Sequence, residues 1–140
     1  MEYKKPLPNP NPDTRTFWEQ CKNHRLTFQK CNDCNHVRWP PALICPLCHS
    51  ISHDSIESIG KGTVFSFVVY HQAFHPSFRE DVPYIVAVVK LEEGPQFVSN
   101  IVGCEPDQVS CDMPVELVWE DITEKFSLPK FRPVSVHDRR

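Results

Sequence analysis

Glycine is scarce in this sequence, and long hydrophobic runs are absent from it. Four glycines in 140 residues leave little room for the Gly-rich loops that cradle nucleotide phosphates. No apolar run approaches the ~20 residues of a membrane-spanning helix, and residues 1–15 hold no apolar stretch that could act as a secretory signal. We therefore expect a cytoplasmic protein without a membrane partner, whose thiols stay reduced.

Recognisable catalytic signatures are missing as well. The sequence has no Ser-His-Asp order, no HExxH motif and no EF-hand pattern, so the usual nucleophilic and metalloprotease chemistries are not indicated. A hydrophobic share of 40% and a mean hydropathy of -0.40 suit one modest core. We expect a small protein that is not an enzyme when it acts alone.

Acidic and basic side chains are unevenly divided along the chain. Residues 1–50 carry 7 basic and 4 acidic side chains, whereas residues 51–140 carry 8 basic and 14 acidic ones. An acidic C-terminal part repels phosphate backbones at long range. The charge pattern therefore disfavours nucleic acid as a partner.

The N-terminal part predicts an extended arm followed by a short helix. Residues 6–12 alternate proline with polar residues, which favours an extended chain. Three residues can cap the helix that follows: Asp13, Thr14 and Thr16. Thr16 and Glu19 match a capping box, while Phe17 and Cys21 lie four apart and so share one helical face.

From residue 53 onward the sequence is typical of β-strands. Four segments are rich in β-branched and aromatic residues between turn residues: 62–71, 83–91, 96–102 and 114–120. Residues 53–59 would supply a fifth strand, which is the count of an OB-type barrel. The segment 62–71 is apolar on both faces, so one face needs the barrel interior and the other needs a lid or a partner.

Four of the seven cysteines form two Cys-x2-Cys pairs separated by ten residues. They are Cys31, Cys34, Cys45 and Cys48. Each pair directs two sulfurs to one point, and two pairs complete the tetrahedron that Zn²⁺ prefers. Four thiolates leave no open coordination position, so we expect a structural zinc, with iron in the same ligand set as an alternative. Asn35 and His49 follow the pairs, where positive φ is often needed and these residue types tolerate it.

The remaining cysteines are Cys21, Cys104 and Cys111. An odd total of seven fits a disulfide framework poorly. We expect each of the three to be a small buried hydrophobe, because free cysteine is among the most buried residue types.

Ten further residues are candidates for contact with a ligand or a partner. They are Phe17, Trp18, Arg25, Arg38, Trp39, His71, Phe74, His75, Phe78 and Arg79. The last five lie in a long aromatic connection between strands, of the kind that often binds partners. For Phe17 and Trp18 we favour a structural role, in which they clamp the helix to the body.

A series of segments then occurs in a recognisable order: CNDC…WPPALICPLC, GKGTVFSFVVYH, PYIVAVVKLEEGP, SNIVGCEPDQV, MPVELVWEDIT and LPKFRP. Over residues 14–133 the chain resembles the zinc-ribbon plus OB-fold family long classed as a domain of unknown function. The resemblance implies a mainly β fold with a short N-terminal helix, a rubredoxin-like zinc ribbon and an OB-like barrel. The two cysteine pairs then hold the zinc. The chain departs from the family at Asn35 and Asp112, where glycine is usual, and both residues tolerate the left-handed region.

We expect four parts with these boundaries: arm and helix at 1–27, zinc ribbon at 28–52, OB-fold domain at 53–134, and a fraying tail at 135–140. The resemblance also implies a non-catalytic accessory subunit in lipid metabolism, which binds and stabilises a thiolase-like or hydratase-type acyl-CoA enzyme and helps form its acyl-CoA site. Two alternatives stay open. One is a single-stranded nucleic-acid-binding protein, since zinc ribbons and OB-folds both serve that purpose, and the other is a stand-alone acyl-CoA or lipid carrier.

Overall fold

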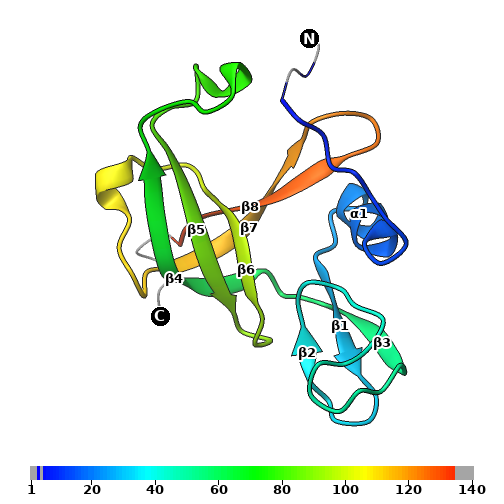
Figure 1. The fold of residues 1–140 in the computed structure, drawn as a ribbon. Helices are drawn as coiled ribbons and strands as arrows, with labels where there is room; N and C mark the ends of the chain where they lie inside the picture. The colour runs from blue at the N-terminus through cyan, green and yellow to red at the C-terminus, as the bar shows by residue number, and fades with distance from the viewer. Residues whose placement is uncertain (1–2, 4, 135–140) are drawn as a thin grey trace.

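Three parts follow one another along the chain: an extended arm, a helix with a small three-stranded sheet, and a closed five-stranded barrel (Figure 1). This computed structural model describes residue 3 and residues 5–134. The expected tail at 135–140 lies outside the described residues, as do residues 1, 2 and 4 of the arm. The mainly β fold expected from the sequence is confirmed.

The single helix of the described residues, α1, spans Arg15–Lys22. Thr14 occupies the N-cap, but its side chain makes no capping hydrogen bond. Because the helix begins one residue before Thr16, the predicted capping box between Thr16 and Glu19 is wrong. The side chain of Asn11 accepts from the backbone N–H of Thr14 at 2.9 Å and shapes the entry to the helix instead.

The small sheet has the strand order β2-β1-β3, with β1 at Thr27–Cys31, β2 at Val37–Arg38 and β3 at His53–Glu57. β3 pairs with β1 along its whole length, in antiparallel register. The prediction that residues 53–59 form a barrel strand is therefore wrong. The two cysteine turns bring the chain back beside β1 before it can reach the barrel, and an alternating polar strand suits either sheet.

The barrel closes in the order β4-β5-β6-β8-β7, with β7 returning to β4. Its strands are β4 (Lys61–Tyr70), β5 (Tyr84–Leu91), β6 (Gln96–Ile101), β7 (Pro114–Asp121) and β8 (Ser127–Pro133). The four strands expected from residue 62 onward are confirmed, and β8, expected only as an apolar closing segment, is the fifth. Two 3-10 turns, η1 (Pro76–Phe78) and η2 (Pro106–Gln108), lie in the connections.

At Gly62 the backbones of β4 and β5 approach each other closely. A Cβ on this residue would lie 3.1 Å from Cα of Leu91 and would collide with the carbonyl oxygen of Lys90. Both contacts are backbone, which cannot move aside as a flexible side chain can. A side chain at this position would therefore push β4 away from β5.

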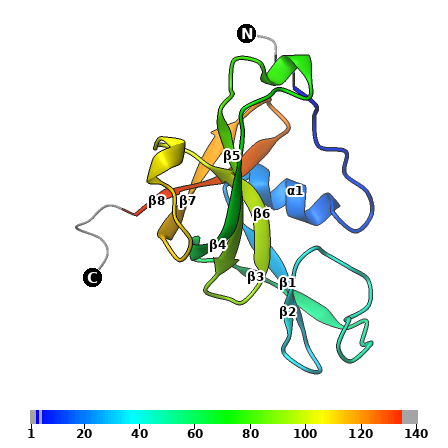
Figure 2. The same cartoon turned by 60° about the vertical axis from the view of Figure 1, so that its left-hand side comes forward.

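One aromatic cluster joins the helix, the small sheet and the barrel. Phe97 on β6 lies 4.9 Å from Trp39, 6.1 Å from Phe17 and 6.2 Å from Phe28, between ring centroids. Phe17 and Cys21 face this core from α1 and are buried, as their spacing predicts. The helix, the small sheet and the barrel therefore share a single hydrophobic core, and Figure 2 shows α1 beside both sheets.

Candidate metal centre and contact surfaces

The four paired cysteines converge at one end of the small sheet. Their Sγ atoms all lie within 4.8 Å of one another, with Cys31 3.5 Å from Cys48 and Cys34 3.6 Å from Cys45. A tetrahedral zinc–thiolate site with bonds of about 2.3 Å has sulfur–sulfur edges of about 3.8 Å. The donor set and its spacing therefore fit a tetrahedral metal ion, as the sequence predicts.

The two cysteine turns are built alike. In the first, the N–H of Asn35 donates to the carbonyl of Cys31 at 3.0 Å, and in the second the N–H of His49 donates to Cys45 at 2.9 Å. Asn35 and His49 have φ values of 64° and 66°, so the expected left-handed residues are confirmed. Asp112, the other residue at a usual glycine position, has a φ of 68°.

Backbone amides prepare the buried thiols of this centre for metal binding. Backbone hydrogen bonds from Cys34 and Asp33 lower the pKa of Cys31, the larger effect coming from Cys34. A backbone hydrogen bond from Cys48 likewise lowers the pKa of Cys45. The thiolate is the form that binds a metal, so these amides favour loading.

The three cysteines outside the centre differ from one another in burial. Cys21 is fully buried, and this burial raises its pKa to about 12, which keeps it an inert thiol. Cys104 is half-buried, whereas Cys111 is exposed. The expectation of burial is therefore confirmed for Cys21 and wrong for Cys111, which lies in a surface turn before β7.

The aromatic connection between β4 and β5 gathers five of the ten residues expected to bind a ligand or a partner. Phe74 is 76% exposed and touches Tyr70 edge-on at 5.9 Å, while Phe78 packs on Tyr84 at 5.6 Å. The His75 ring accepts the backbone N–H of Ser77 and starts η1. His71 and Arg79 are exposed nearby in sequence. The loop thus presents aromatic and basic side chains to solvent, and its binding role stays a prediction.

The other five of these residues lie on or near the helix and the small sheet. Phe17 is 4% exposed and Trp18 packs edge-on against it at 5.1 Å, so this pair holds the helix in place. Trp39 lies 4.4 Å from Phe17. Arg25 is exposed, 3.9 Å from a carboxylate of Glu57, and Arg38 is buried. Phe17, Arg38 and Trp39 line one common pocket, and Phe17, Trp18 and Trp39 line another beside β6.

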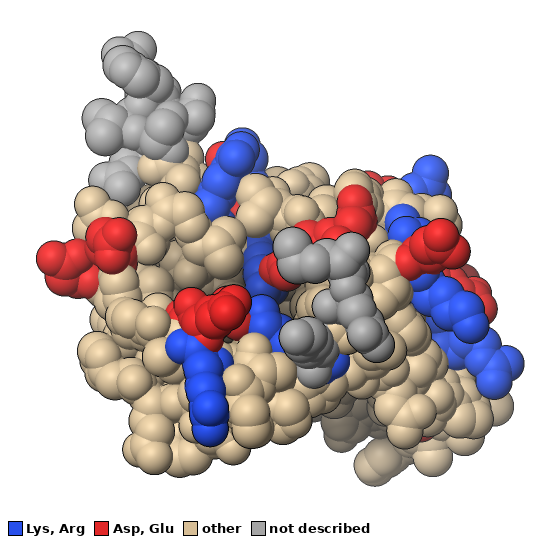
Figure 3. All heavy atoms as spheres, turned by 90° about the horizontal axis from the view of Figure 1, so that it is seen from above, with Lys and Arg blue, Asp and Glu red and all other residues tan. Residues whose placement is uncertain are grey.

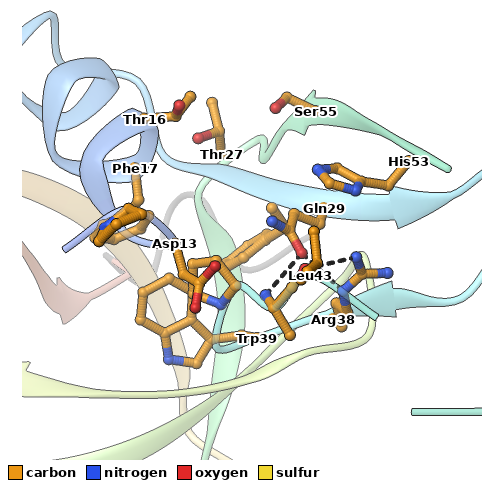
Figure 4. Close-up of a pocket in the computed structure, with 14 residues that line it drawn as sticks. Asp13, Thr16, Phe17, Thr27, Gln29, Arg38, Trp39, Leu43, His53 and Ser55 are labelled. Atoms are coloured by element: carbon orange, nitrogen blue, oxygen red, sulfur yellow. Dashed lines mark hydrogen bonds between the residues drawn. The ribbon is translucent and has the colours of Figure 1, made fainter. Parts of the chain in front are cut away.

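This pocket is also lined by Gln29, His53 and Ser55, which the sequence analysis did not single out as binding residues. It lies between the start of α1 and the polar face of the small sheet, with a volume of about 210 Å³ (Figure 4). Gln29 on β1 pairs with Arg38 on β2 and with Ser55 on β3. His53 lies two residues before Ser55 on β3, on the same face of the sheet. The alternation of polar residues along β1 and β3 is the sequence signal that marks this face.

A second exposed feature is the outward side of β4, β5 and β6, here called the outer apolar face. Its residues are Phe65, Val68, Val86, Val88 and Val98. Cross-strand register places Val68 beside Val86 and Val88 beside Val98. Phe65, Val68 and Val98 are 55%, 53% and 61% exposed, so the second face of β4, expected to need cover, is open to solvent.

Comparison with known proteins matches this architecture. Residues 18–52 match the rubredoxin-like zinc ribbon domain of ChsH2, and residues 56–120 match its C-terminal OB-fold domain. A DUF35 domain-containing scaffold protein of Methanothermobacter thermautotrophicus is 34% identical over 79% of this chain and 84% of its own length. The chain belongs to the DUF35 family of zinc-ribbon and OB-fold proteins.

Two further relatives carry names from acyl-CoA chemistry or aldol cleavage. A chain of the solved Ltp2-ChsH2(DUF35) aldolase is 41% identical, with a TM-score of 0.83 over 91% of this chain and 98% of that one. A probable enoyl-CoA hydratase alpha subunit of Thermomonospora curvata is also 41% identical, over 92% of this chain. The chain spans 40% of that subunit's length. Within residues 3 and 5–134, no helix has the length and hydropathy to cross a membrane.

Proposed function

We propose that this chain is a non-catalytic accessory subunit, which binds a thiolase-like or hydratase-type acyl-CoA enzyme and helps form that enzyme's acyl-CoA site. The observation that carries the proposal is the outer apolar face. Soluble proteins rarely leave a contiguous apolar strand surface uncovered, and such surfaces mark interaction sites. Relatives named as a scaffold protein and as a chain of an aldolase complex support a subunit role.

The outer apolar face has the composition of an interface core. Valine and phenylalanine side chains from three adjacent strands gather on it, and the cross-strand register places only the uncharged Ser66 and Asn100 between them. Burying one such side chain fully is worth about 1.5–3 kcal/mol. The mostly exposed Phe65, Val68 and Val98 can therefore supply several kcal/mol to a complex. This surface would seat the partner enzyme.

The metal in this proposal is zinc, and its role is structural. The four thiols converge on one point, so they would fill all four positions of a tetrahedral ion and leave none for substrate. When bound, the ion would hold the two cysteine turns together and so keep β1, β2 and β3 in place. Cys31, Cys34, Cys45 and Cys48 would act only as ligands.

The charge distribution favours an enzyme partner over nucleic acid. Single-strand binding needs a continuous basic groove with interleaved aromatic side chains. Over the described residues visible from above, acidic side chains lie among the basic ones (Figure 3). The barrel half also carries the excess of acidic residues.

The test is to isolate the untagged protein gently from its native cells and to identify what travels with it by mass spectrometry. We expect a thiolase-like or hydratase-type enzyme in stoichiometric amount. Recovery of RNA, DNA or transcription proteins in its place would contradict the proposal.

A matched pair of variants then locates the interface. Val98 is 61% exposed on the outer apolar face, and Ile59 is 64% exposed outside it. Val98→Gln should weaken the complex about tenfold or more, as loss of a buried interface side chain does, and Ile59→Gln should leave it unchanged. Equal affinity of both variants for the partner would remove the outer apolar face from the interface.

A further inference from the structure

The geometry points to a binding site for the oxyanion group of a small organic molecule, in the pocket between α1 and the polar face of the small sheet. The ligand is a phosphate monoester or a carboxylate with an apolar or aromatic body. The site lies wholly within this chain, and it stands whether or not the proposed partner is correct.

Arg38 is a buried positive charge with no acidic partner among the described residues. Its side chain is 3% exposed, yet it faces no carboxylate within ion-pair distance among the described residues. Nε donates to Oε1 of Gln29 at 2.7 Å, and Nη2 donates to the carbonyl of Ala42 at 3.0 Å. Arginine stays charged at all ordinary pH values, so a buried positive charge is held there by neutral partners.

Two buried nitrogen atoms at this site have no partner within the described structure: Nη1 of Arg38 and Nδ1 of His53. Nη1 of Arg38 is a charged donor, and a buried donor without an acceptor costs about 1–3 kcal/mol, and more when it is charged. Both side chains line the pocket, where Thr27 and Ser55 add hydroxyl groups. An oxyanion would supply the missing acceptor and also neutralise the guanidinium, and charge-assisted bonds of this kind are the strong ones.

The opposite wall of the pocket is aromatic and so favours an apolar body on the ligand. Phe17 and Trp39 line that side, and Figure 4 shows them across from Arg38 and His53. A volume of about 210 Å³ accepts one anionic group with a small ring, not a whole nucleotide coenzyme. An anion with a compact apolar body therefore matches both walls.

Asp13 lines the same pocket and is exposed. Its carboxylate repels an anion, so it lowers affinity without preventing binding, because an exposed charge is screened by water. This residue offers a variant that should strengthen binding, a result that loss of folding cannot imitate.

The experiment titrates the metal-loaded protein with phenyl phosphate, benzoate, inorganic phosphate and the neutral control phenol, followed by two-dimensional NMR. We expect phenyl phosphate and benzoate to cause saturable shifts of resonances around the pocket at low concentration. Inorganic phosphate and phenol should cause none at the same concentration. Arg38→Met should weaken binding about ten- to a hundredfold, the value of one charge-assisted hydrogen bond. Asp13→Asn should strengthen it about threefold, as expected for one screened charge. Arg25→Met, an exposed arginine outside the pocket, is the matched control and should change nothing.

If Arg38→Met does not fold, Thr16→Trp takes its place, because Thr16 is exposed at the pocket and a large ring there blocks entry. Tighter binding of phenyl phosphate assigns a phosphate ester, and tighter binding of benzoate assigns a carboxylate. Phenol or inorganic phosphate binding as well as phenyl phosphate would overturn the proposal. The proposal would also be overturned if Arg25→Met weakened binding as much as Arg38→Met, or if no probe gave a saturable shift. Displacement of phenyl phosphate by the partner enzyme would overturn it too, because a side chain of that enzyme would then be the occupant of the pocket.

Discussion

Truncation of Phe97 should destabilise the whole protein, not only the barrel. The ring is 5% exposed and contacts aromatic residues from the helix, the small sheet and the barrel, namely Phe17, Phe28, Trp39 and Phe131. Phe97→Ala removes a buried ring and leaves a cavity, which costs about 3–5 kcal/mol. With a urea m-value of about 2 kcal/mol per molar, the midpoint of unfolding should fall by about 2 M.

The assay is urea unfolding of the metal-loaded protein, monitored both by tryptophan fluorescence and by far-UV circular dichroism. Val98→Ala is the matched control, since Val98 is the next residue on β6 but is 61% exposed. It should cost less than about 1 kcal/mol, as surface changes usually do. A loss below about 1 kcal/mol for Phe97→Ala would refute the shared core. Retention of normal stability in the barrel, with unfolding of the small sheet alone, would refute it equally.

Three further predictions concern the metal centre, the helix and the barrel. Cys45→Ser should release the metal and unfold the small sheet, since structural zinc supplies about 10–16 kcal/mol in small peptides; metal analysis and circular dichroism check this, and full metal content in the variant would contradict it. The hydrogen bond from His24 to Asp121 at 2.7 Å lowers the pKa of that carboxyl, so its contribution to stability is complete above the usual pKa of about 3.9 and is lost as pH falls below it. Asp121→Asn should therefore flatten the acid limb of a melting-temperature profile, and an unchanged limb would exclude the contact. Gly62→Ala should lower the melting temperature by several degrees because its Cβ meets the backbone of Lys90, and an unchanged melting temperature would show that β4 can shift freely.

Local patterns predicted the metal centre well. The spacing of the cysteine pairs and the residue types at Asn35 and His49 both describe contacts within one turn of chain, so sequence alone carries them. The two residues have the expected left-handed backbone, and the four thiols converge as a metal ion requires. The apolar strands of the barrel were recognisable for the same reason.

The pairing of strands that lie far apart in the chain could not be predicted from the sequence. Residues 53–57 alternate in a way that suits any sheet, and only the return of the chain beside β1 assigns them to the small one. The strand Ser127–Pro133 contains two prolines, which argue against a barrel strand, yet it lies between β6 and β7.

The pocket at Arg38 was hidden from sequence in a similar way. Arginine is normally an exposed residue, and nothing near it in sequence indicates that its charge is buried without a carboxylate. The position of His53 beside it follows from the pairing of β3 with β1.

The central claim is that this chain serves another enzyme's acyl-CoA chemistry. The most direct measurement is the rate of acyl-CoA turnover by the co-purified enzyme, produced alone and then with this chain added back in its metal-loaded form. Our account predicts that turnover or the stability of the enzyme rises to a plateau at a fixed stoichiometry, and that Val98→Gln shifts this plateau to higher concentration. An enzyme that is fully active and stable alone, with no response to the added chain, would contradict the account.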